Sequence, residues 1–249
     1  QHLGNTLAAI ADQKAGIIKR ARPVVVGNLP ASAQQVVRQV AADFQSPLFT
    51  LGKDFTIRQT SSHQFQATVD YQGLGLANLR CQLGLGGDYQ VENAAVALAA
   101  TQLFLSRRHL PLDRSALRRG LHETRWPGRL ELVNTEPLVL LDGAHNLPGI
   151  QALVKTIQDD FADRDVYLLV AILADKQYEL MLGELASLGN VHIMVTHFAG
   201  PGPRRPSADL TGVAKEIASR YPIQVAAQWQ LGFQELAGQL SSDDVMIVT

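Results

Sequence analysis

The chain has 249 residues, of which 46% are hydrophobic and 18% are charged, and its formal net charge is −1. This composition is typical of a globular protein with a substantial core, and a charge near zero argues against a general nucleic-acid binder. A single cysteine, Cys81, excludes an internal disulfide and fits a reducing compartment such as the cytoplasm. No apolar run reaches the roughly 18 residues that indicate a membrane span, and the first residues do not form a signal peptide.

Apolar periodicity and turn residues predict mixed structure in the first half of the chain. In chain order we expect a helix over 6–18 with Asn5 as its N-cap, a short buried strand over 23–27, a helix over 32–44, antiparallel β-hairpins over 48–83, a Gly-rich turn over 83–90, an Ala-rich helix over 91–104 and a helix over 112–122. The second of these helices is expected to turn Val36, Val37, Val40 and Phe44 inward.

Residues 124–128, Thr-Arg-Trp-Pro-Gly, interrupt this pattern and predict a domain boundary. After them, apolar runs alternate with helical segments, which is typical of a parallel sheet with helices on both faces. The predicted strands cover 138–142, 166–173, 191–196, 223–226 and 245–249, and the predicted helices lie near 149–162, 176–187, 207–220 and 230–240. The sequence therefore predicts an α/β protein of two domains, 1–125 and 126–249.

In open α/β sheets, ligands bind beyond the carboxyl ends of the strands. Three short segments follow predicted strands in this way: 142–146 (Asp-Gly-Ala-His-Asn), Asp175–Lys176 and Thr196–His197. In the first of them, a carboxylate and an imidazole stand next to a helix start, whose N–H groups suit phosphate. The alternative is a solvated turn in which Asn146 only caps the helix.

Three further side chains are candidates for function. Lys14 falls on the apolar stripe of its predicted helix, where a lysine either reaches solvent or serves a site. Arg129 follows a rigid Pro-Gly and presents a planar fork that suits phosphate oxygens, with a surface ion pair to Glu131 as the alternative. Asn93 stands near the start of the Ala-rich helix, where an amide reads a base edge or caps the helix.

Four segments, taken in order, resemble the signatures of folylpolyglutamate synthases and dihydrofolate synthases within the Mur ligase family. They are LGNTLAAIADQKAGIIK, GDYQVENAAVALAA, RWPGRLE and LLDGAHN, and the segments ADKQYELM and MIVT are similar too. The resemblance spans the whole chain. The pair RWPGRLE and LLDGAHN is its most specific part.

The resemblance implies an ATP-dependent ligase with ATP and Mg²⁺ as cofactors. ATP phosphorylates a carboxylate of folate or dihydropteroate, and the amine of L-glutamate attacks the acyl phosphate. The implied fold is the remainder of a P-loop ATPase domain with a small antiparallel β part, followed by a Rossmann-like C-terminal domain. The sequence contains no GxxxxGK[ST] motif. We therefore expect a fragment trimmed at both ends, inactive on its own.

The resemblance also implies roles for five residues. Lys14 matches a lysine that is carbamylated in relatives and helps to position magnesium. Asn93 matches an ATP-contacting residue, and Arg129 and Asp142 match residues that hold the nucleotide. His145 matches a histidine near the phosphates and the incoming glutamate.

Three positions depart from the family pattern, although none is a matched catalytic position. Gln13 replaces the usual Glu, Tyr89 replaces a frequent His, and Leu147 separates Pro148 from the DGAHN segment. Two alternatives stay open: a peptidoglycan-type Mur ligase, and a nucleotide-binding module without catalysis. The relatives further suggest a monomer, and the composition predicts a cytoplasmic protein that binds neither nucleic acid nor membrane.

Overall fold

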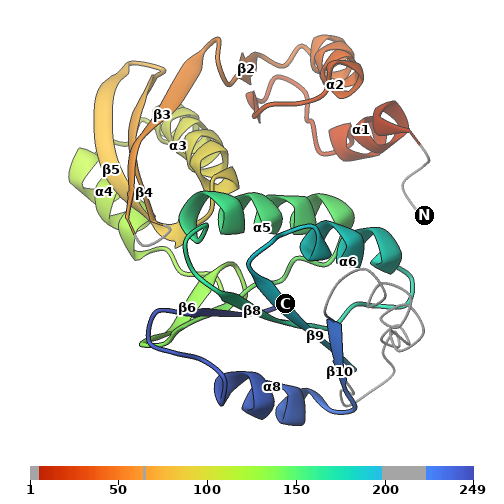
Figure 1. Cartoon of the computed structure of the whole chain (residues 1–249). Helices are drawn as coiled ribbons and strands as arrows, with labels where there is room; N and C mark the ends of the chain where they lie inside the picture. Colours follow the sequence, from red (N-terminus) through yellow and green to blue (C-terminus); the bar gives the residue numbers. More distant parts are fainter. Residues whose placement is uncertain (1–5, 64–65, 198–222) are drawn as a thin grey trace. The chain divides into compact units, whose positions relative to one another are not determined.

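The computed structural model describes residues 6–63, 66–197 and 223–249 (Figure 1). The chain forms two compact units: Gln1–Gly84 with Tyr89–Thr124, and Leu85–Asp88 with Arg125–Thr249. Each combines helices with β-sheet, so the α/β class is confirmed. The assignment of 1–125 and 126–249 to particular domains stays a prediction, and the predicted helix over 207–220 lies outside the described residues.

The first unit holds a small parallel sheet and a separate three-stranded sheet, with order β3-β4-β5. Strands β1 and β2 pair in parallel, whereas β3 and β4 pair antiparallel, as the hairpin prediction required. The elements are α1 (Leu7–Ala15), β1 (Val24–Val26), α2 (Ala31–Asp43), β2 (Leu48–Thr50), β3 (Phe55–His63), β4 (Gln66–Gly73), β5 (Leu76–Gly86), α3 (Tyr89–Arg107) and α4 (Arg114–Glu123).

Helix α3 packs on the three-stranded sheet through alanines and leucines, which lose little side-chain freedom in a helix. A pair of polar side chains is buried in this core. The Tyr71 hydroxyl donates to Gln102 Oε1 at 2.6 Å, and Gln102 Nε2 donates to the Gly73 carbonyl at 3.1 Å. Burial raises the pKa of Tyr71 to about 12. The pair therefore fixes the position of the helix on the sheet without an unsatisfied polar group.

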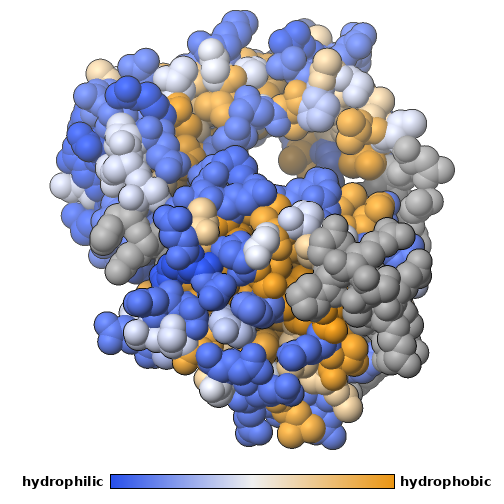
Figure 2. Space-filling view, in the orientation of Figure 1, coloured by the Kyte–Doolittle hydropathy of each residue, from blue (hydrophilic) through white to orange (hydrophobic). Residues whose placement is uncertain are grey.

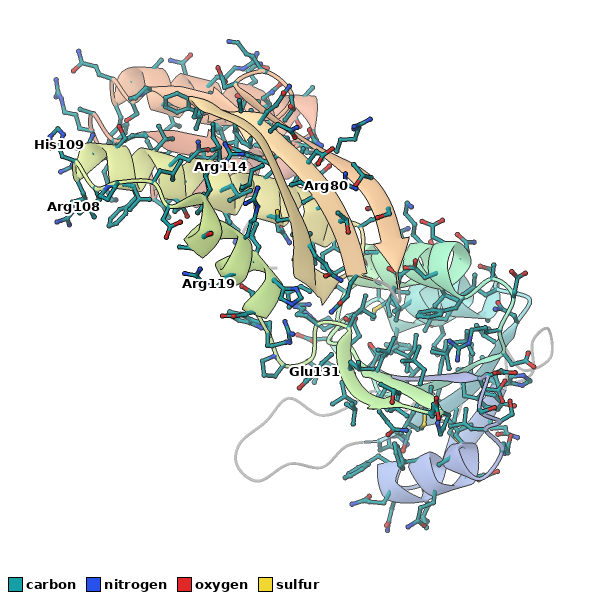
Figure 3. All side chains as sticks on the ribbon, turned by 90° about the vertical axis from the view of Figure 1, so that its left-hand side faces the viewer. Arg80, Arg108, His109, Arg114, Arg119 and Glu131 are labelled. Atoms are coloured by element: carbon teal, nitrogen blue, oxygen red, sulfur yellow. The ribbon has the colours of Figure 1, made fainter. Side chains whose placement is uncertain are left out.

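Helix α4 follows the edge of β5 and brings arginine side chains to the carbonyl groups of this strand. Arg114 donates to the carbonyls of Ala77 and Asn78, and Arg118 donates to the carbonyl of Arg80. In Figure 3, Arg80 and Arg114 are labelled on this part of the unit. A strand edge that is occupied in this way does not invite pairing with another chain.

Several predicted details of the first unit are wrong. The N-cap of α1 is Thr6 instead of Asn5, because the Thr6 hydroxyl accepts the Ala9 N–H at 3.1 Å. Phe44 is the C-cap of α2 and is 42% exposed, so it does not face inward. Strand β1 is half-buried, not buried.

The predicted Gly-rich turn is also shorter than expected. Strand β5 continues through the glycines to Gly86, so that the turn is confined to Gly87 and Asp88.

The second unit is built on a six-stranded mixed sheet with the order β10-β9-β8-β11-β7-β6. The strands β7 to β11 are parallel, as predicted, and β6 alone is antiparallel to its neighbour β7. The elements are β6 (Glu131–Thr135), β7 (Leu138–Leu141), α5 (Leu147–Asp160), β8 (Val166–Val170), α6 (Tyr178–Ala186), β9 (Val191–Thr196), β10 (Ile223–Ala226), α8 (Trp229–Ala237) and β11 (Val245–Val248).

Helices cover both faces of this sheet: α5 and α6 lie on one face and α8 on the other (Figure 1). The central strand β11 is therefore buried on both sides, and Val245, Met246 and Ile247 are fully inaccessible. In the same orientation, hydrophilic residues dominate the surface over α5, while apolar residues are visible between α5 and α8 (Figure 2). No helix in the described part of the chain is long and apolar enough to span a membrane.

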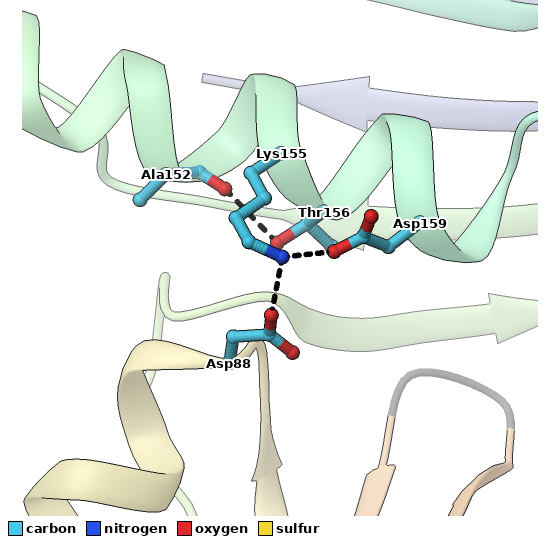
Figure 4. A network of polar contacts seen from close by, with 5 residues as sticks. All are labelled: Asp88, Ala152, Lys155, Thr156 and Asp159. Atoms are coloured by element: carbon cyan, nitrogen blue, oxygen red, sulfur yellow. Dashed lines mark hydrogen bonds and ion pairs between the residues drawn. The ribbon is translucent and has the colours of Figure 1, made fainter.

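The short segment Leu85–Asp88 belongs to the second unit although its flanking residues belong to the first. Asp88 accepts from Lys155 of α5 at 2.6 Å, and Lys155 also pairs with Asp159 one turn further along (Figure 4). The two carboxylates hold the pKa of Lys155 above its usual range. Ion pairs between exposed groups contribute little to stability. This contact nevertheless shows that the segment lies against α5.

Candidate active site

Three parallel strands of the second unit end at the same level. Leu141 of β7 and Leu169 of β8 are both in register with Val248 of β11. The Asp142 N–H then donates to the Val248 carbonyl, and the Ala171 N–H to the Thr249 carbonyl, each at 2.9 Å. The loops that follow these strands therefore leave the sheet side by side, at the edge where open α/β sheets place their ligands.

Asp142 joins the loop after β7 to the segment before β6. Its Oδ2 accepts the Leu130 N–H at 3.1 Å, and its Oδ1 accepts the Ala144 N–H at 2.9 Å. Burial raises the pKa of Asp142, while these backbone hydrogen bonds and the charge of Arg129 lower it, and burial has the larger effect. The carboxylate is thus a structural link as well as a candidate ligand.

The backbone of residues 128–130 takes an uncommon path to reach Asp142. Gly128 has φ +68° and Leu130 has φ +46°, although Leu130 is a branched residue and only 3% exposed. Such a conformation is strained for a residue other than glycine and persists where its surroundings impose it. Here the hydrogen bond to Asp142 imposes it on Leu130, which fixes the direction of the preceding residue, Arg129.

Glu131 uses its carboxylate on the backbone of the same turn. Its Oε2 accepts the Gly128 N–H at 2.9 Å, and Figure 3 shows Glu131 at the start of β6. This contact replaces the surface ion pair with Arg129 that the sequence left open.

Gly143 allows the two segments to approach closely. A Cβ atom at this position would lie 3.0 Å from the Gly128 carbonyl oxygen and 4.0 Å from Arg129 Nη1. A larger side chain would push the Arg129 turn away from the loop after β7. The close approach therefore favours glycine at position 143, and the sequence pattern alone did not predict this steric requirement.

His145 is exposed, and one of its ring nitrogens is engaged. Its Nδ1 lies 2.8 Å from the Gly143 carbonyl oxygen. A carbonyl only accepts, so this contact assigns the hydrogen to Nδ1 and leaves Nε2 for a ligand. Asn146 caps α5 by accepting the Gly149 N–H at 2.8 Å, so the capping role predicted for it is confirmed.

Thr249 was not singled out from the sequence. Its Oγ1 lies 3.4 Å from the Ala144 carbonyl oxygen and so ties the end of β11 to the loop after β7. Its position as the last residue of the last predicted strand, 245–249, was the available signal.

Lys14 lies in the first unit and is exposed. Of the two alternatives that the apolar stripe left open, the side chain of Lys14 reaches solvent, while Ala11, Ala15 and Ile18 beside it are buried. Lys14 also lines a cavity of about 350 Å³ between α1, α2 and β1, whose other lining residues are apolar, among them the stripe residues Leu7, Ile10 and Ala11.

Asn93 is exposed on α3, also in the first unit. Its Nδ2 donates to Gln90 Oε1 at 2.9 Å, so the two amides hold each other near the helix start. Of the five predicted site residues, the structure brings together Arg129, Asp142 and His145, all in the second unit. It places Lys14 and Asn93 in the first.

Metal binding has little support from side-chain clusters. Within residues 6–63, 66–197 and 223–249, no group of three or more His, Cys, Asp or Glu side chains is arranged to hold a metal ion.

Comparison with known proteins points to one family. A family model described as Mur ligase, glutamate ligase domain, matches residues 128–249. Folylpolyglutamate synthase of Lacticaseibacillus casei is 34% identical over 207 residues, which cover 83% of this chain and 47% of that protein. Dihydrofolate synthase/folylpolyglutamate synthase of Bacillus subtilis is 32% identical over 219 residues, which cover 88% and 50%.

Solved structures agree with these relatives. Mycobacterium tuberculosis folylpolyglutamate synthase complexed with ADP matches with a TM-score of 0.86 and 25% identity, over 100% of this chain and 57% of that one. The apo form of the L. casei enzyme matches with a TM-score of 0.79 and 27% identity, over 99% and 54%. The chain spans about half the length of the curated relatives it matches. It belongs to the Mur ligase family, in the branch of folylpolyglutamate and dihydrofolate synthases.

Proposed function

We propose that this chain is the downstream part of an ATP-dependent ligase that adds L-glutamate to folate, with dihydropteroate as the corresponding substrate of a dihydrofolate synthase activity. The observation that carries this proposal is the link made by Asp142, whose two hydrogen bonds hold the Arg129 turn against the loop that bears His145. Relatives with the same fold are folylpolyglutamate synthases, one of them complexed with ADP.

The proposed domain assignment follows from the family. Residues 1–125 are the remainder of the central P-loop ATPase domain, with β3 to β5 as its small antiparallel part. Residues 126–249 form a Rossmann-like ligase domain. The parallel pairing of β1 with β2, and of β7 to β11, supports this assignment.

The proposed reaction has two steps. A carboxylate oxygen of the folate attacks the γ-phosphorus of ATP, ADP leaves, and an acyl phosphate forms. The neutral amine of L-glutamate then attacks the acyl carbon, and the amide forms as phosphate leaves and takes up the proton that the amine loses. Binding of both reactants in one site removes much of the entropic barrier to such a reaction.

The residues of the second unit have distinct roles in this scheme. Arg129 offers paired N–H donors to phosphate oxygens, which is the geometry that guanidinium groups favour. Asp142 positions Arg129 and contacts the nucleotide. His145 presents Nε2 to the phosphates and the incoming glutamate.

The first unit contributes Asn93, which contacts ATP, and Lys14. Carbamylated Lys14 would offer oxygen atoms, the ligands that Mg²⁺ prefers. Among the described residues, no three or more His, Cys, Asp or Glu side chains are arranged to hold a metal ion, and we assign no step to the ion.

The proposed partners are small molecules only: folate or dihydropteroate, L-glutamate and ATP. The proposed setting is a cytoplasmic monomer, with no nucleic-acid or membrane partner.

The decisive experiment measures ADP release by the complete protein that contains this chain, with ATP, magnesium and L-glutamate, in the presence and absence of a reduced folate. We expect folate-dependent release that falls roughly 100-fold or more in Arg129→Ala and His145→Ala, as losses of charge-stabilising and proton-transferring groups do. His192→Ala is the matched control, because His192 is an exposed histidine near the amino end of β9.

Each other outcome has a definite meaning. Turnover that does not depend on folate but requires another carboxylate substrate would favour a peptidoglycan-type Mur ligase. Nucleotide binding without turnover on any acceptor would favour the non-catalytic module.

A further inference from the structure

The segment that ends at Arg129 is a tight turn, and it begins with a large aromatic residue. The Arg129 N–H donates to the Trp126 carbonyl at 3.2 Å, and Gly128 between them has φ +68°. Proline at the second position of a turn and a glycine with positive φ at the third are the signature of a type II β-turn. The Cα atoms of the first and last residues of such a turn lie within about 7 Å of each other, so the indole of Trp126 and the guanidinium of Arg129 start from neighbouring points.

Two hydrogen bonds and one close contact hold this turn in place. Glu131 Oε2 accepts the Gly128 N–H at 2.9 Å, and Asp142 Oδ2 accepts the Leu130 N–H at 3.1 Å. The loop after β7 packs so closely that a Cβ atom on Gly143 would lie 3.0 Å from the carbonyl oxygen of Gly128. The backbone that carries the two side chains is therefore fixed before a ligand arrives, which lowers the entropic cost of binding.

The indole of Trp126 is open to solvent although its backbone is fixed. The residue is 64% exposed, and within the part of the chain that the structure describes, its indole has neither a hydrogen bond nor a ring contact. A single apolar residue on a surface is common, but Trp126 shares its turn with the proposed phosphate ligand Arg129. A rigid, uncovered indole at such a place is a surface on which a planar ring stacks.

The chemistry of the proposed substrates identifies the ring. L-Glutamate has no ring, and folate has a ring but no phosphate. ATP alone carries a planar ring and phosphates in one small molecule, and a single ribose joins them. A turn that presents a guanidinium for phosphate oxygens and an indole for a planar ring matches these two ends of a nucleotide.

We propose that Trp126 stacks on the base of the ATP molecule whose phosphates Arg129 binds. This inference rests on the nucleotide binding in the proposed function and deepens it, because it assigns the base a contact of its own. Stacking does not read the edge of a base, so Trp126 supplies affinity for the ring and not selectivity among purines.

Binding measurements on the complete protein test the proposal with two ligands, ATP and inorganic tripolyphosphate, which lacks the base. Calorimetry with magnesium and without folate gives the Kd of each. In Trp126→Ala, we expect the Kd for ATP to rise roughly 5- to 100-fold, the effect of removing an aromatic partner from a base, while the Kd for tripolyphosphate stays unchanged. Arg129→Ala should weaken the binding of both ligands.

Two further variants serve as controls. Trp126→Phe keeps an aromatic face and should recover most of the affinity for ATP. Trp229→Ala should change neither Kd; Trp229 is the other tryptophan of the chain and stands, 47% exposed, at the start of α8.

Fluorescence provides a readout that a merely structural role would not change. A base stacked on an indole quenches its emission, so ATP should quench the tryptophan fluorescence of the wild type and tripolyphosphate should not. The part of this quenching that belongs to Trp126 should disappear in Trp126→Phe.

Three outcomes contradict the inference. An unchanged Kd for ATP in a folded Trp126→Ala protein overturns it. An equal rise in the Kd for ATP and for tripolyphosphate also overturns it, because the substitution would then act through the Arg129 turn. A rise in the KM for folate with an unchanged Kd for ATP overturns it as well and assigns the indole to the folate ring.

Failure of the proposed function gives a different result. A complete protein that binds ATP through Trp126 but shows no folate-dependent release of ADP would overturn the proposed function and leave this inference intact. A complete protein that binds no nucleotide would overturn both.

Discussion

The burial of Asp142 and its hydrogen bonds shift its pKa in opposite directions. As a link between two segments it is buried, and burial disfavours its charged form. As an acceptor of two backbone N–H groups and a neighbour of Arg129, it is favoured in the charged form. Burial has the larger effect, so the folded protein binds the proton of Asp142 more tightly than the unfolded chain does.

This balance predicts a pH-dependent difference between the wild type and Asp142→Asn. The pKa of Asp142 in the folded state is raised above its ordinary value of 3.8. Its contribution to stability is therefore present below pH 3.8 and is lost as the pH rises through the folded pKa. We expect the free energy of unfolding of the wild type, relative to Asp142→Asn, to be highest at low pH and to fall as the pH rises.

Urea unfolding of both proteins at several pH values between 3 and 7 measures this difference. A difference that grows with pH would mean that the hydrogen bonds and Arg129 outweigh burial. Asn carries no titrating group, so its own pH dependence serves as the baseline.

Lys14 illustrates what periodicity cannot predict. A helical repeat places Lys14 near Ala11 and Ala15, but it does not say which side another element covers. Helix α2 packs on the side of Ala15 and Ile18 through Val37, which leaves Lys14 at the exposed margin. The positions of Asp142 and His145 in the fold were easier to predict, because a polar residue directly after an apolar strand has a fixed place in an α/β sheet.

Among the strands of the second unit, the buried ones were predicted well, and one exposed edge strand was missed. Strands β8 and β11 are continuous apolar runs, as fully covered parallel strands are, and β9 is interrupted by the exposed His192. Strand β6 was missed: four of its five residues are exposed at the edge of the sheet, so its sequence carries little apolar pattern.

The packing of α8 leads to a prediction about Gly232. A Cβ atom there would lie 2.9 Å from Ala226 Cβ and 3.0 Å from Leu169 Cδ1. We expect Gly232→Ala to destabilise the protein by roughly 1–3 kcal/mol, the usual cost of overpacking, although alanine is the better helix former.

Gly183 of α6 is the matched control, because a Cβ atom there meets nothing within 4 Å. Gly183→Ala should leave stability unchanged or raise it by up to about 1 kcal/mol. Chemical denaturation of both variants measures the contrast. Equal effects would show that α8 moves freely away from the sheet.

At the scale of the whole molecule, local sequence signals predict the break between the units but not the contacts between residues far apart in the sequence. The break at residues 124–128 is local and was visible as Pro and Gly. Leu85–Asp88 belongs to the second unit, and Asp88 in this segment pairs with Lys155, 67 residues further along the chain. No periodicity or turn signal reports a contact of such sequence separation.

The sequence lacks a motif that the proposed reaction needs, so we predict that the chain cannot carry out this reaction alone. Its sequence has no GxxxxGK[ST] loop to cradle a triphosphate, and its described residues have no acidic cluster for a metal ion. We expect the isolated chain to release no ADP above background with ATP, magnesium, folate and L-glutamate, whereas the complete protein turns over. Folate-dependent ADP release by the isolated chain, abolished in Arg129→Ala, would contradict this and place the whole triphosphate site within these 249 residues.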